Sequence, residues 1–427
     1  MKPYKKYKDS GIEWIGEIPE HWEVKKIKHN TYLKARVGWK GLRSDEFLDE
    51  GFAYLLTGTD LKNGNVDWEH SYFIDEVRYD DDPFIQLKEN DLLITKDGTI
   101  GKVAIVDKLN KPACLNSGVF VMRPLNKEWE TKYLFNVLSS NVFKSFIDLT
   151  SYGSTILHLY QNVFNEFQFP LPPIKDQNAI IKYLDTKTTE INQNIADKEK
   201  LIALFEEEKK ALINQAVTKG LNPKAKLKPS GIDWLGDIPE HWEVKRVKHV
   251  LQSLNTKRVP LSSEERGIMT ERVYDYYGAS GIIDKVENYI FDEPLILVGE
   301  DGANLLSRST RLAFIAEGKY WVNNHAHILK PIIGEIKFYC ELLENYDFSI
   351  WVTGSAQPKL TSENLMNIKF IVPPIKEQSG IVNHIDKISE TIDNKISITN
   401  QEIELLKEYS AALIFEAVTG KIDITNN

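Results

Sequence analysis

The chain has 427 residues, of which 42% are apolar and 11% aromatic, which suits two or three packed domains and excludes a disordered protein. Its two cysteines, Cys114 and Cys340, cannot make a disulfide framework or a cysteine-rich zinc site, and they fit a reducing cytoplasm. The net charge of −9 argues against a protein that wraps nucleic acid by itself, because Lys and Arg supply most non-specific affinity for phosphates.

The sequence contains no membrane signal. No apolar run approaches the roughly 20 residues of a membrane span, and the opening segment MKPYKKYKDS has no signal-peptide core. We therefore expect a cytoplasmic protein that does not contact a membrane.

The first element along the chain is a leader at 10–28, and it returns almost unchanged at 230–248. The two segments read SGIEWIGEIPEHWEVKKIK and SGIDWLGDIPEHWEVKRVK, 220 positions apart. Two further pairs recur 201 positions apart: FPLPPIKDQ at 169–177 with FIVPPIKEQ at 370–378, and LINQAVT at 212–218 with LIFEAVT at 413–419. The chain therefore consists of two homologous halves, each with a shared frame around a variable insert.

The leaders differ in character from the inserts that follow them. The leaders are basic, with net charges of +2 for 1–29 and +3 for 219–249. The inserts are acidic, with −5 for the first insert (30–174) and −4 for the second insert (250–375). Each leader has two tryptophans, Trp14 with Trp22 and Trp234 with Trp242, and we expect them to pack the leader onto the frame rather than stack on bases.

Both inserts read as mixed α/β (α+β) domains. Short β-rich runs interrupted by Asp-Gly turns predict strands within 91–106, 118–124, 294–306 and 326–331, and 132–147 reads as helical. The two inserts share sparse landmarks, among them Asp97-Gly98 with Asp301-Gly302. We expect two similar folds with diverged surfaces.

After each PPIK sequence the apolar residues repeat every 3.5 positions, which is typical of a coiled-coil seam. The first seam comprises Ile181, Leu184, Ile191, Ile195, Ile202, Phe205 and Leu212. The second comprises Val382, Ile385, Ile392, Ile396, Ile403, Leu406 and Leu413. Matched seams favour two long helices paired as an antiparallel coiled coil with pseudo-two-fold symmetry; the alternative is two separate helices, each packed on its own domain.

These elements predict five segments along the chain. They are a first recognition domain with its leader at 1–175, a first spacer helix at 176–218, a second recognition domain with its leader at 219–375, a second spacer helix at 376–419 and a tail at 420–427.

Motifs for chemistry are weak. LPPI (171–174) and VPPI (372–375) are similar to the Asn/Asp-Pro-Pro-aromatic tetrapeptide of amino-methylating DNA methyltransferases, but both lack its first and last residues, so stiff helix starts are favoured. No phosphate-binding P-loop occurs. His325 and His327 have no further ligand cluster nearby, and structural or hydrogen-bonding histidines are favoured over a metal site. We expect no catalytic residue, no metal and no cofactor bound by this chain.

The paired leaders, the two PPIK-[DE]-Q helix starts and the two A-V-T helix ends resemble the specificity subunits of type I restriction-modification systems. GASGIID (278–284) and GEDGAN (299–304) with WVNNHAHILKP (321–331) are similar to a common kind of target-recognition domain in that family. The resemblance covers essentially the whole chain.

The resemblance implies a non-catalytic subunit whose two recognition domains each read one half of a split, asymmetric site on double-stranded DNA. It implies that the helices set the spacing and bind two methyltransferase (M) subunits, and that restriction (R) subunits add to this core. Adenine N6 methylation would use S-adenosylmethionine held by the M subunits, and cleavage would use ATP and Mg²⁺ in the R subunits. A two-headed protein-binding scaffold without DNA specificity is the alternative, and a self-sufficient methyltransferase is disfavoured by the absent tetrapeptide.

Side chains that pair with base edges are mostly Arg, Lys, Asn, Gln, Asp, Glu, Ser and Thr, and loops usually carry them. On these grounds the predicted DNA contacts of the first insert are Lys96, Thr99, Lys102, Ser154, Thr155 and His158. Those of the second insert are Ser280, Asn304, Asn324, His325, Gln357 and Lys359.

Overall fold

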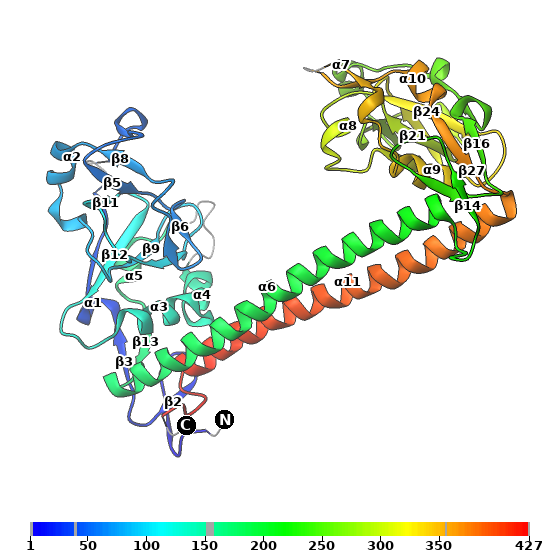
Figure 1. The fold of residues 1–427 in the computed structure, drawn as a ribbon. Helices are drawn as coiled ribbons and strands as arrows, with labels where there is room; N and C mark the ends of the chain where they lie inside the picture. Colours follow the sequence, from blue (N-terminus) through cyan, green and yellow to red (C-terminus); the bar gives the residue numbers. More distant parts are fainter. Residues whose placement is uncertain (1–2, 38–40, 151–157, 355–356, 426–427) are drawn as a thin grey trace. The chain divides into compact units, whose positions relative to one another are not determined.

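The structure is a computed structural model that describes residues 3–37, 41–150, 158–354 and 357–425. The chain divides into two compact units. Unit 1 comprises Met1–Lys198 with Gln401–Asn427, and unit 2 comprises Glu199–Asn400. Each unit therefore combines one leader, one insert and a portion of both long helices (Figure 1).

The first insert is built on a four-stranded antiparallel sheet in the order β10-β9-β12-β4. Its strands are β4 (Thr31–Lys34), β9 (Leu92–Thr95), β10 (Val103–Ile105) and β12 (Val119–Pro124). A second sheet, β11-β5-β8, contains β5 (Ala53–Leu56), β8 (Tyr72–Ile74) and β11 (Ala113–Leu115), and β6 (Leu61–Lys62) pairs with β7 (Asn65–Val66). The α-helices of the insert are α2 (Glu76–Asp80), α3 (Thr131–Ser139), α4 (Asn141–Thr150) and α5 (Gln161–Phe164), and α1 (Ile27–Asn30) joins the leader to the insert.

The second insert repeats this plan. Its main sheet has the order β17-β24-β21-β22, with β17 (Leu251–Ser253), β21 (Leu295–Gly299), β22 (Ala313–Ala316) and β24 (Ala326–Pro331). A second sheet, β19-β18-β23-β20, contains β18 (Tyr274–Gly278), β19 (Gly281–Val286), β20 (Phe291–Asp292) and β23 (Lys319–Val322), and β25 (Val352–Thr353) pairs with β26 (Lys359–Leu360). The helices are α7 (Ser263–Gly267), α8 (Asn304–Ser307), α9 (Ile336–Glu344) and α10 (Ser362–Asn367).

The main sheets explain why the strand predictions were correct. Every residue of β9 and of β21 is buried, as expected for central strands covered on both faces. The predicted helical stretch 132–147 is two helices, because the chain breaks at Ser140, whose hydroxyl donates back to the carbonyl of Val137 (2.7 Å).

Each leader forms strands that join it to the start of a long helix. In unit 1, β1 (Tyr7–Asp9) pairs with β2 (Glu17–Pro19), and β3 (Glu23–Lys26) pairs with β13 (Gln168–Leu171). In unit 2, β14 (Leu227–Pro229) pairs with β15 (Asp237–Pro239), and β16 (Glu243–Arg246) pairs with β27 (Lys369–Val372). Trp22 and Trp242 are fully buried, which confirms the prediction that the leader tryptophans pack onto the frame.

The PPIK-[DE]-Q motif ends a strand and starts a long helix. Gln177 is fully buried; its amide donates to the carbonyls of Glu128 (2.9 Å) and Pro172 (2.8 Å) and accepts from the N–H of Glu130 (2.8 Å). Gln378 bonds the carbonyl of Pro373 and the N–H of Glu335 in the same way. The glutamine therefore ties the helix start to its insert.

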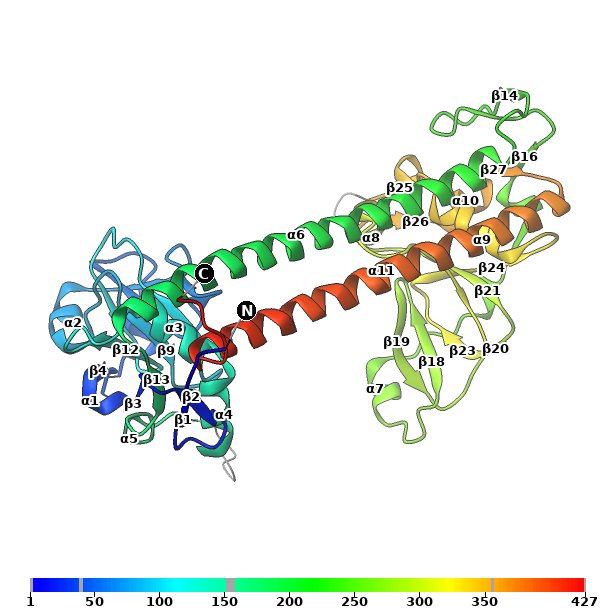
Figure 2. The ribbon, with the colours of Figure 1, turned by 90° about the horizontal axis from the view of Figure 1, so that it is seen from below.

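The two long helices are α6 (Ile174–Lys219, 46 residues) and α11 (Ile375–Val418, 44 residues). Figures 1 and 2 show them running alongside one another. Their direction is antiparallel, because Lys198 contacts Glu402 (2.6 Å) in unit 1 whereas Lys209 contacts Asp393 (2.8 Å) in unit 2. The expected pair of packed helices is confirmed.

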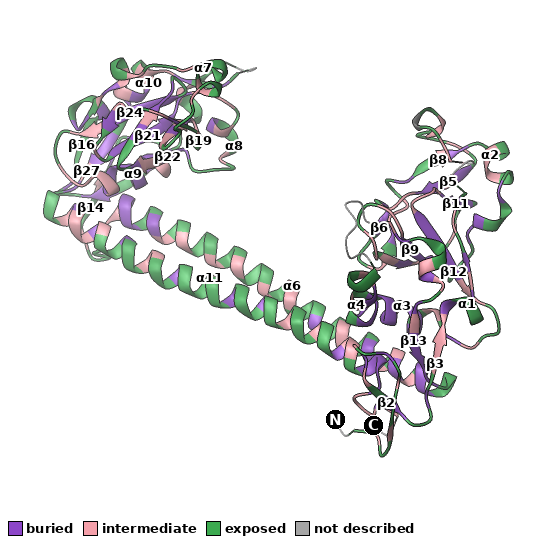
Figure 3. Cartoon of the chain, turned by 180° about the vertical axis from the view of Figure 1, so that it is seen from behind, coloured by how far each residue is buried: buried purple, intermediate pink, exposed green. Residues whose placement is uncertain are grey.

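The predicted seam residues differ in burial from the rest of the two helices. All fourteen seam residues are buried or half-buried, whereas most other helix positions are exposed (Figure 3). Lys198 and Lys209 also occupy positions of the 3.5-residue pattern of α6, and their ammonium groups contact carboxylates on α11. Among the described helices, none has an apolar stretch long enough to cross a lipid bilayer.

Each long helix ends against a leader. Gly220 follows α6 with φ +75°, and a Cβ there would lie 3.0 Å from the ring of Trp242. Gly420 follows α11 with φ +69° and is packed more tightly, since a Cβ there would clash with the ring of Pro19 and lie 3.1 Å from that of Trp22. The Tyr7 hydroxyl donates to the carbonyl of Gly420 (3.1 Å). The second leader thus continues from the helix on which it packs, whereas the first packs on a helix from the other end of the chain.

Candidate nucleic-acid interface

Three segments meet at one edge of the main sheet in each insert, and we call this arrangement the junction. In the first insert it comprises 96–98, 116–118 and 158–159; in the second, 300–302, 323–325 and 359–360. The backbone connections are the same. Lys96 N–H donates to the carbonyl of Gly118 (2.9 Å), and its carbonyl accepts from the N–H of Leu159 (2.8 Å).

Glu300 repeats both bonds, with the carbonyl of His325 (2.8 Å) and the N–H of Leu360 (2.8 Å). Lys96 and Glu300 are therefore equivalent positions. A buried or half-buried asparagine supports each junction: Asn116 accepts from the N–H of Ser117 (2.8 Å), and Asn323 from that of His325 (2.7 Å). The junction thus contains several predicted DNA contacts on one backbone framework.

In the first junction the central group is Asp97. Its carboxylate lies 3.6 Å from the Lys96 ammonium and binds Nδ1 of His158. Lys96 is only 14% exposed and lies over the ring of Phe120, 5.6 Å from its centroid. The His158 ring packs on Tyr160, whose side chain is exposed. Of the predicted contacts, Lys96 and His158 therefore meet here.

The turn after β9 places the next two predicted residues. Thr95 Oγ1 donates to the carbonyl of Thr99 (2.5 Å) and accepts from the N–H of Lys102 (3.0 Å). The side chains of Thr99 and Lys102 are exposed. Lys102 lines a cavity of about 980 Å³ together with Lys62, Lys132 and part of α6. The predicted contacts Ser154 and Thr155 lie outside the described residues.

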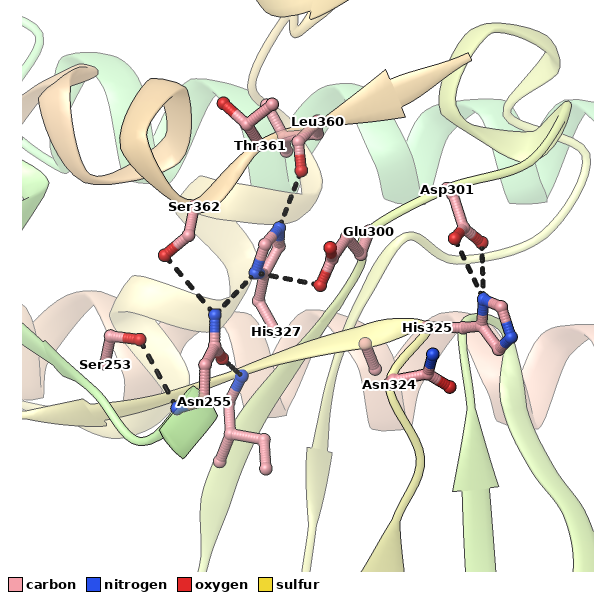
Figure 4. Close-up of polar contacts among 12 residues, drawn as sticks. Ser253, Asn255, Glu300, Asp301, Asn324, His325, His327, Leu360, Thr361 and Ser362 are labelled. Carbon is pink, nitrogen blue, oxygen red and sulfur yellow. Dashed lines mark hydrogen bonds and ion pairs between the residues drawn. The ribbon is translucent and has the colours of Figure 1, made fainter. Parts of the chain in front are cut away.

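In the second junction a buried histidine replaces the apolar packing (Figure 4). His327 Nε2 lies 2.8 Å from the carbonyl of Leu360, and Nδ1 lies 2.9 Å from the amide nitrogen of Asn255. A carbonyl can only accept, so these contacts assign the proton to Nε2 and make Nδ1 the acceptor. Burial lowers the pKa of His327 and keeps the ring neutral.

Glu300 holds the loop in place next to His327. Its carboxylate accepts from Arg258 Nη1 (2.5 Å) and contacts Lys359 Nζ (3.2 Å). Burial opposes ionisation of Glu300, but the Arg258 hydrogen bond and nearby positive groups outweigh it and lower its pKa. Arg258 also donates to the carbonyls of Asn324 (3.2 Å) and Ala326 (2.9 Å). Arg258 therefore fixes the loop that presents Asn324 and His325.

The outer side of this junction is polar and exposed. His325 Nδ1 contacts the Asp301 carboxylate (2.9 Å), while its other ring nitrogen points away from the cluster in Figure 4. Asn324 and Lys359 are exposed. The turn with Ser280 is near, because a Cβ on Gly299 would lie 3.0 Å from the carbonyl of Ala279. The structure thus places Asn324, His325 and Lys359 in one junction, and the turn that carries Ser280 lies next to it.

Two predicted residues behave differently from these. The Asn304 amide donates to the carbonyl of Thr310 (3.1 Å) and accepts from its N–H (2.9 Å) and from Ser309 (3.2 Å). That side chain is occupied by its own loop. Gln357 is exposed beside Gly354, which has φ +87°. Sequence reasoning missed Arg258, Glu300 and Asn255; aligning Lys96-Asp97-Gly98 with Glu300-Asp301-Gly302 could have found Glu300.

Among the described residues there is neither a metal site nor a reactive thiol. In the described ranges, no three His, Cys, Asp or Glu residues gather as a metal site. His325 and His327 do not converge, since one lies outside the sheet and the other is buried within it. Burial raises the pKa of Cys114 to about 11 and that of Cys340 to about 12, so neither thiol is a ready nucleophile.

A family model described as "Type I restriction modification DNA specificity domain" matches residues 19–200 and again 239–408. The chain belongs to this family. It is a DNA-specificity subunit of a type I restriction-modification system, which is a non-catalytic role, and its two inserts are recognition domains that fit a bipartite site.

Full-length relatives and solved structures agree. The chain is 27% identical to the MjaVIII specificity subunit of Methanocaldococcus jannaschii, over 96% of this chain and 95% of that protein. It is 21% identical to the EcoKI specificity subunit of Escherichia coli K12, over 95% and 90%. A chain of a solved type I system has a TM-score of 0.64 at 15% identity, covering 95% and 99%. The HsdS subunit of Thermoanaerobacter tengcongensis has a TM-score of 0.51 at 13% identity, covering 95% and 98%.

Proposed function

We propose that each junction reads base edges in one half of an asymmetric site on double-stranded DNA. The observation that carries this proposal is that both junctions have the same backbone bonds but different polar side chains. Exposed amide, imidazole and ammonium groups can pair with base edges in the major groove, where each base pair has its own donor and acceptor pattern. A shared framework with different side chains fits two different half-sites.

Individual base contacts follow from exposure. In the second junction we propose Asn324, His325 and Lys359, with Ser280 and Gln357 at the margin. In the first we propose His158 and Thr99, with Lys96 acting partly through Asp97. Lys102 and Asn304 are weaker candidates, because one faces a cavity beside α6 and the other is bonded within its loop. The scaffold alternative is set aside by the family match.

We further propose that the paired helices set the distance between half-sites and carry two methyltransferase subunits. The duplicated frame supports this stoichiometry, since one partner species could bind each half. The partners would hold S-adenosylmethionine for adenine N6 methylation, and restriction subunits would add ATP and Mg²⁺ for cleavage. The whole complex would act in the cytoplasm.

The test is a recognition-domain replacement followed by mapping of methylated adenines. Replacing residues 30–166 with the corresponding part of another subunit should change one half of the methylated site and leave the other half and the spacing intact. His325→Ala in the second insert should relax the sequence preference only in the half-site that this insert reads. Ile268→Ala, which changes an exposed residue of the same insert, should leave both half-sites unchanged. A replacement that alters both half-sites would contradict the modular reading.

A further inference from the structure

The frame strands allow a position-by-position comparison of the two units. Gln168 lies opposite Lys26 where β13 pairs with β3, and Lys369 lies opposite Arg246 where β27 pairs with β16. The next bond is also shared: Ile27 N–H donates to Phe167 (3.0 Å) and Val247 N–H to Ile368 (2.9 Å). The equivalent pairs are therefore Lys26 with Arg246, Lys28 with Lys248, Glu166 with Asn367 and Gln168 with Lys369.

In unit 1 this place holds a carboxylate. Lys26 Nζ donates to one oxygen of Glu166 (2.8 Å), and Lys28 Nζ donates to the other (2.5 Å). The two ammonium groups lower the pKa of Glu166 to about 2. The geometry of the backbone and of two basic side chains is thus suited to grip an anion through two oxygens.

In unit 2 the equivalent position has no carboxylate. Asn367 stands in the place of Glu166, and its Oδ1 has only long contacts with Arg246 (3.5 Å) and Lys248 (3.3 Å). Lys369 adds a third positive charge where unit 1 has a glutamine, and donates to the carbonyl of Gly231 (3.4 Å). Within the described parts of the chain, no carboxylate pairs with any of these three exposed cations. The four positions carry +1 in unit 1 and +3 in unit 2.

We propose that Arg246, Lys248 and Lys369 form a phosphate-binding site for the DNA backbone, present in unit 2 only. This inference rests on the proposed function. A guanidinium and two ammonium groups are the usual partners of phosphate oxygens. Contacts to phosphates position a protein on the duplex while other residues read bases.

The location favours DNA over an acidic protein partner. The helix α10 starts just after Lys359 and Leu360 of the junction and ends at Asn367. Its six residues span about 9 Å, so the basic site lies one short helix from the proposed base contacts. Arg246 and Lys248 belong to the basic second leader, whereas the second insert that carries the junction is acidic, so this site supplies positive charge next to a domain that has little of its own.

Exchange of the one differing side chain tests the proposal. Asn367→Glu restores the carboxylate that Lys26 and Lys28 bind in unit 1, and it should lower the positive charge of the site. Asn367→Gln keeps a neutral amide and serves as the matched control. Glu166→Asn makes the reverse change in unit 1. The full chain, assembled with its methyltransferase partner, is titrated with a labelled duplex carrying the methylated site and with a scrambled duplex, over a series of salt concentrations.

We expect Asn367→Glu to lower the affinity for both duplexes by the same factor. The slope of log affinity against log salt concentration should become shallower by about 1 to 2, because each phosphate contact contributes about 0.9 to it. Asn367→Gln should keep the original slope, and Glu166→Asn should steepen it by about 1. An unchanged slope in a folded Asn367→Glu complex would overturn the proposal. So would an unchanged slope with loss of the methyltransferase on size-exclusion chromatography, which would assign the site to an acidic partner.

The ratio of affinities for the two duplexes separately reports the proposed function. If the original complex does not prefer the methylated site but the slopes change as expected, the phosphate site stands and base reading fails. If it prefers that site and the slopes do not change, base reading stands and the phosphate site fails.

Discussion

The two junctions place different chemistry on one backbone. Ile94 pairs with Phe120 in the first main sheet and Val298 with His327 in the second, so Phe120 and His327 are equivalent, as are Lys96 and Glu300. The first insert packs an ammonium over an aromatic ring, which is an electrostatic attraction to its face. The second uses a network in which the buried Glu300 and His327 bond the half-buried Arg258 and Asn255.

The difference teaches how such a domain can change its target without changing its fold. The backbone bonds at the junction involve no side chain of Lys96 or Glu300, so either residue is compatible with them. A buried network, however, must be satisfied as a whole. The second junction should therefore tolerate single substitutions less well than the first.

The largest effect should come from the spacer, which both inserts share. Adding one seven-residue repeat to α6 and to α11 at facing positions preserves the seam and lengthens it by about 10 Å, roughly three base pairs. Mapping of methylated adenines should show a longer gap with both half-sites unchanged. An unchanged gap in an active variant would mean that the helices are not the spacer.

A smaller effect should distinguish the two junctions by stability. Glu300→Ala leaves Arg258 without its carboxylate and should lower the free energy of unfolding by about 1 to 3 kcal/mol. Lys96→Ala at the equivalent position should cost less, about 1 kcal/mol, because it removes a cation–π contact with Phe120 and a 3.6 Å contact with Asp97, which keeps His158 as a partner. Thermal unfolding of both variants measures the difference, and Glu300→Gln, which retains an acceptor, should be intermediate. Equal losses would show that the network is not coupled.

The smallest effect should be a pH dependence confined to the second insert. Burial depresses the pKa of His327 in the folded state below its ordinary value of 6.5. The unfolded chain then binds the proton more readily than the folded chain. The contribution of the neutral His327 ring to the free energy of unfolding is therefore complete above pH 6.5 and is lost as the pH falls below it. Amide exchange should accelerate in β24 at lower pH, beyond the change seen in β12, where Phe120 cannot titrate. His327→Phe should remove the excess, and its persistence would contradict the assignment.

Much of the architecture was readable from sequence. The duplication indicated two similar units, and the 3.5-residue repeat predicted the paired helices. The β-rich runs predicted β9, β10, β12, β21 and β24 of the main sheets, but not β4, β17 or β22. These features are local patterns or copies of one another, so they can be recognised without knowing which residues meet in space.

The side-chain partners were decided only by tertiary structure. His325 and His327 are two positions apart, yet one is exposed and the other is fully buried between Asn255 and Leu360, which come from distant segments. Asn304 looked available for a base, but the fold turns its amide into its own loop. Periodicity shows which face of an element is buried, whereas a hydrogen-bond partner depends on how remote segments cross, and no local pattern records that crossing.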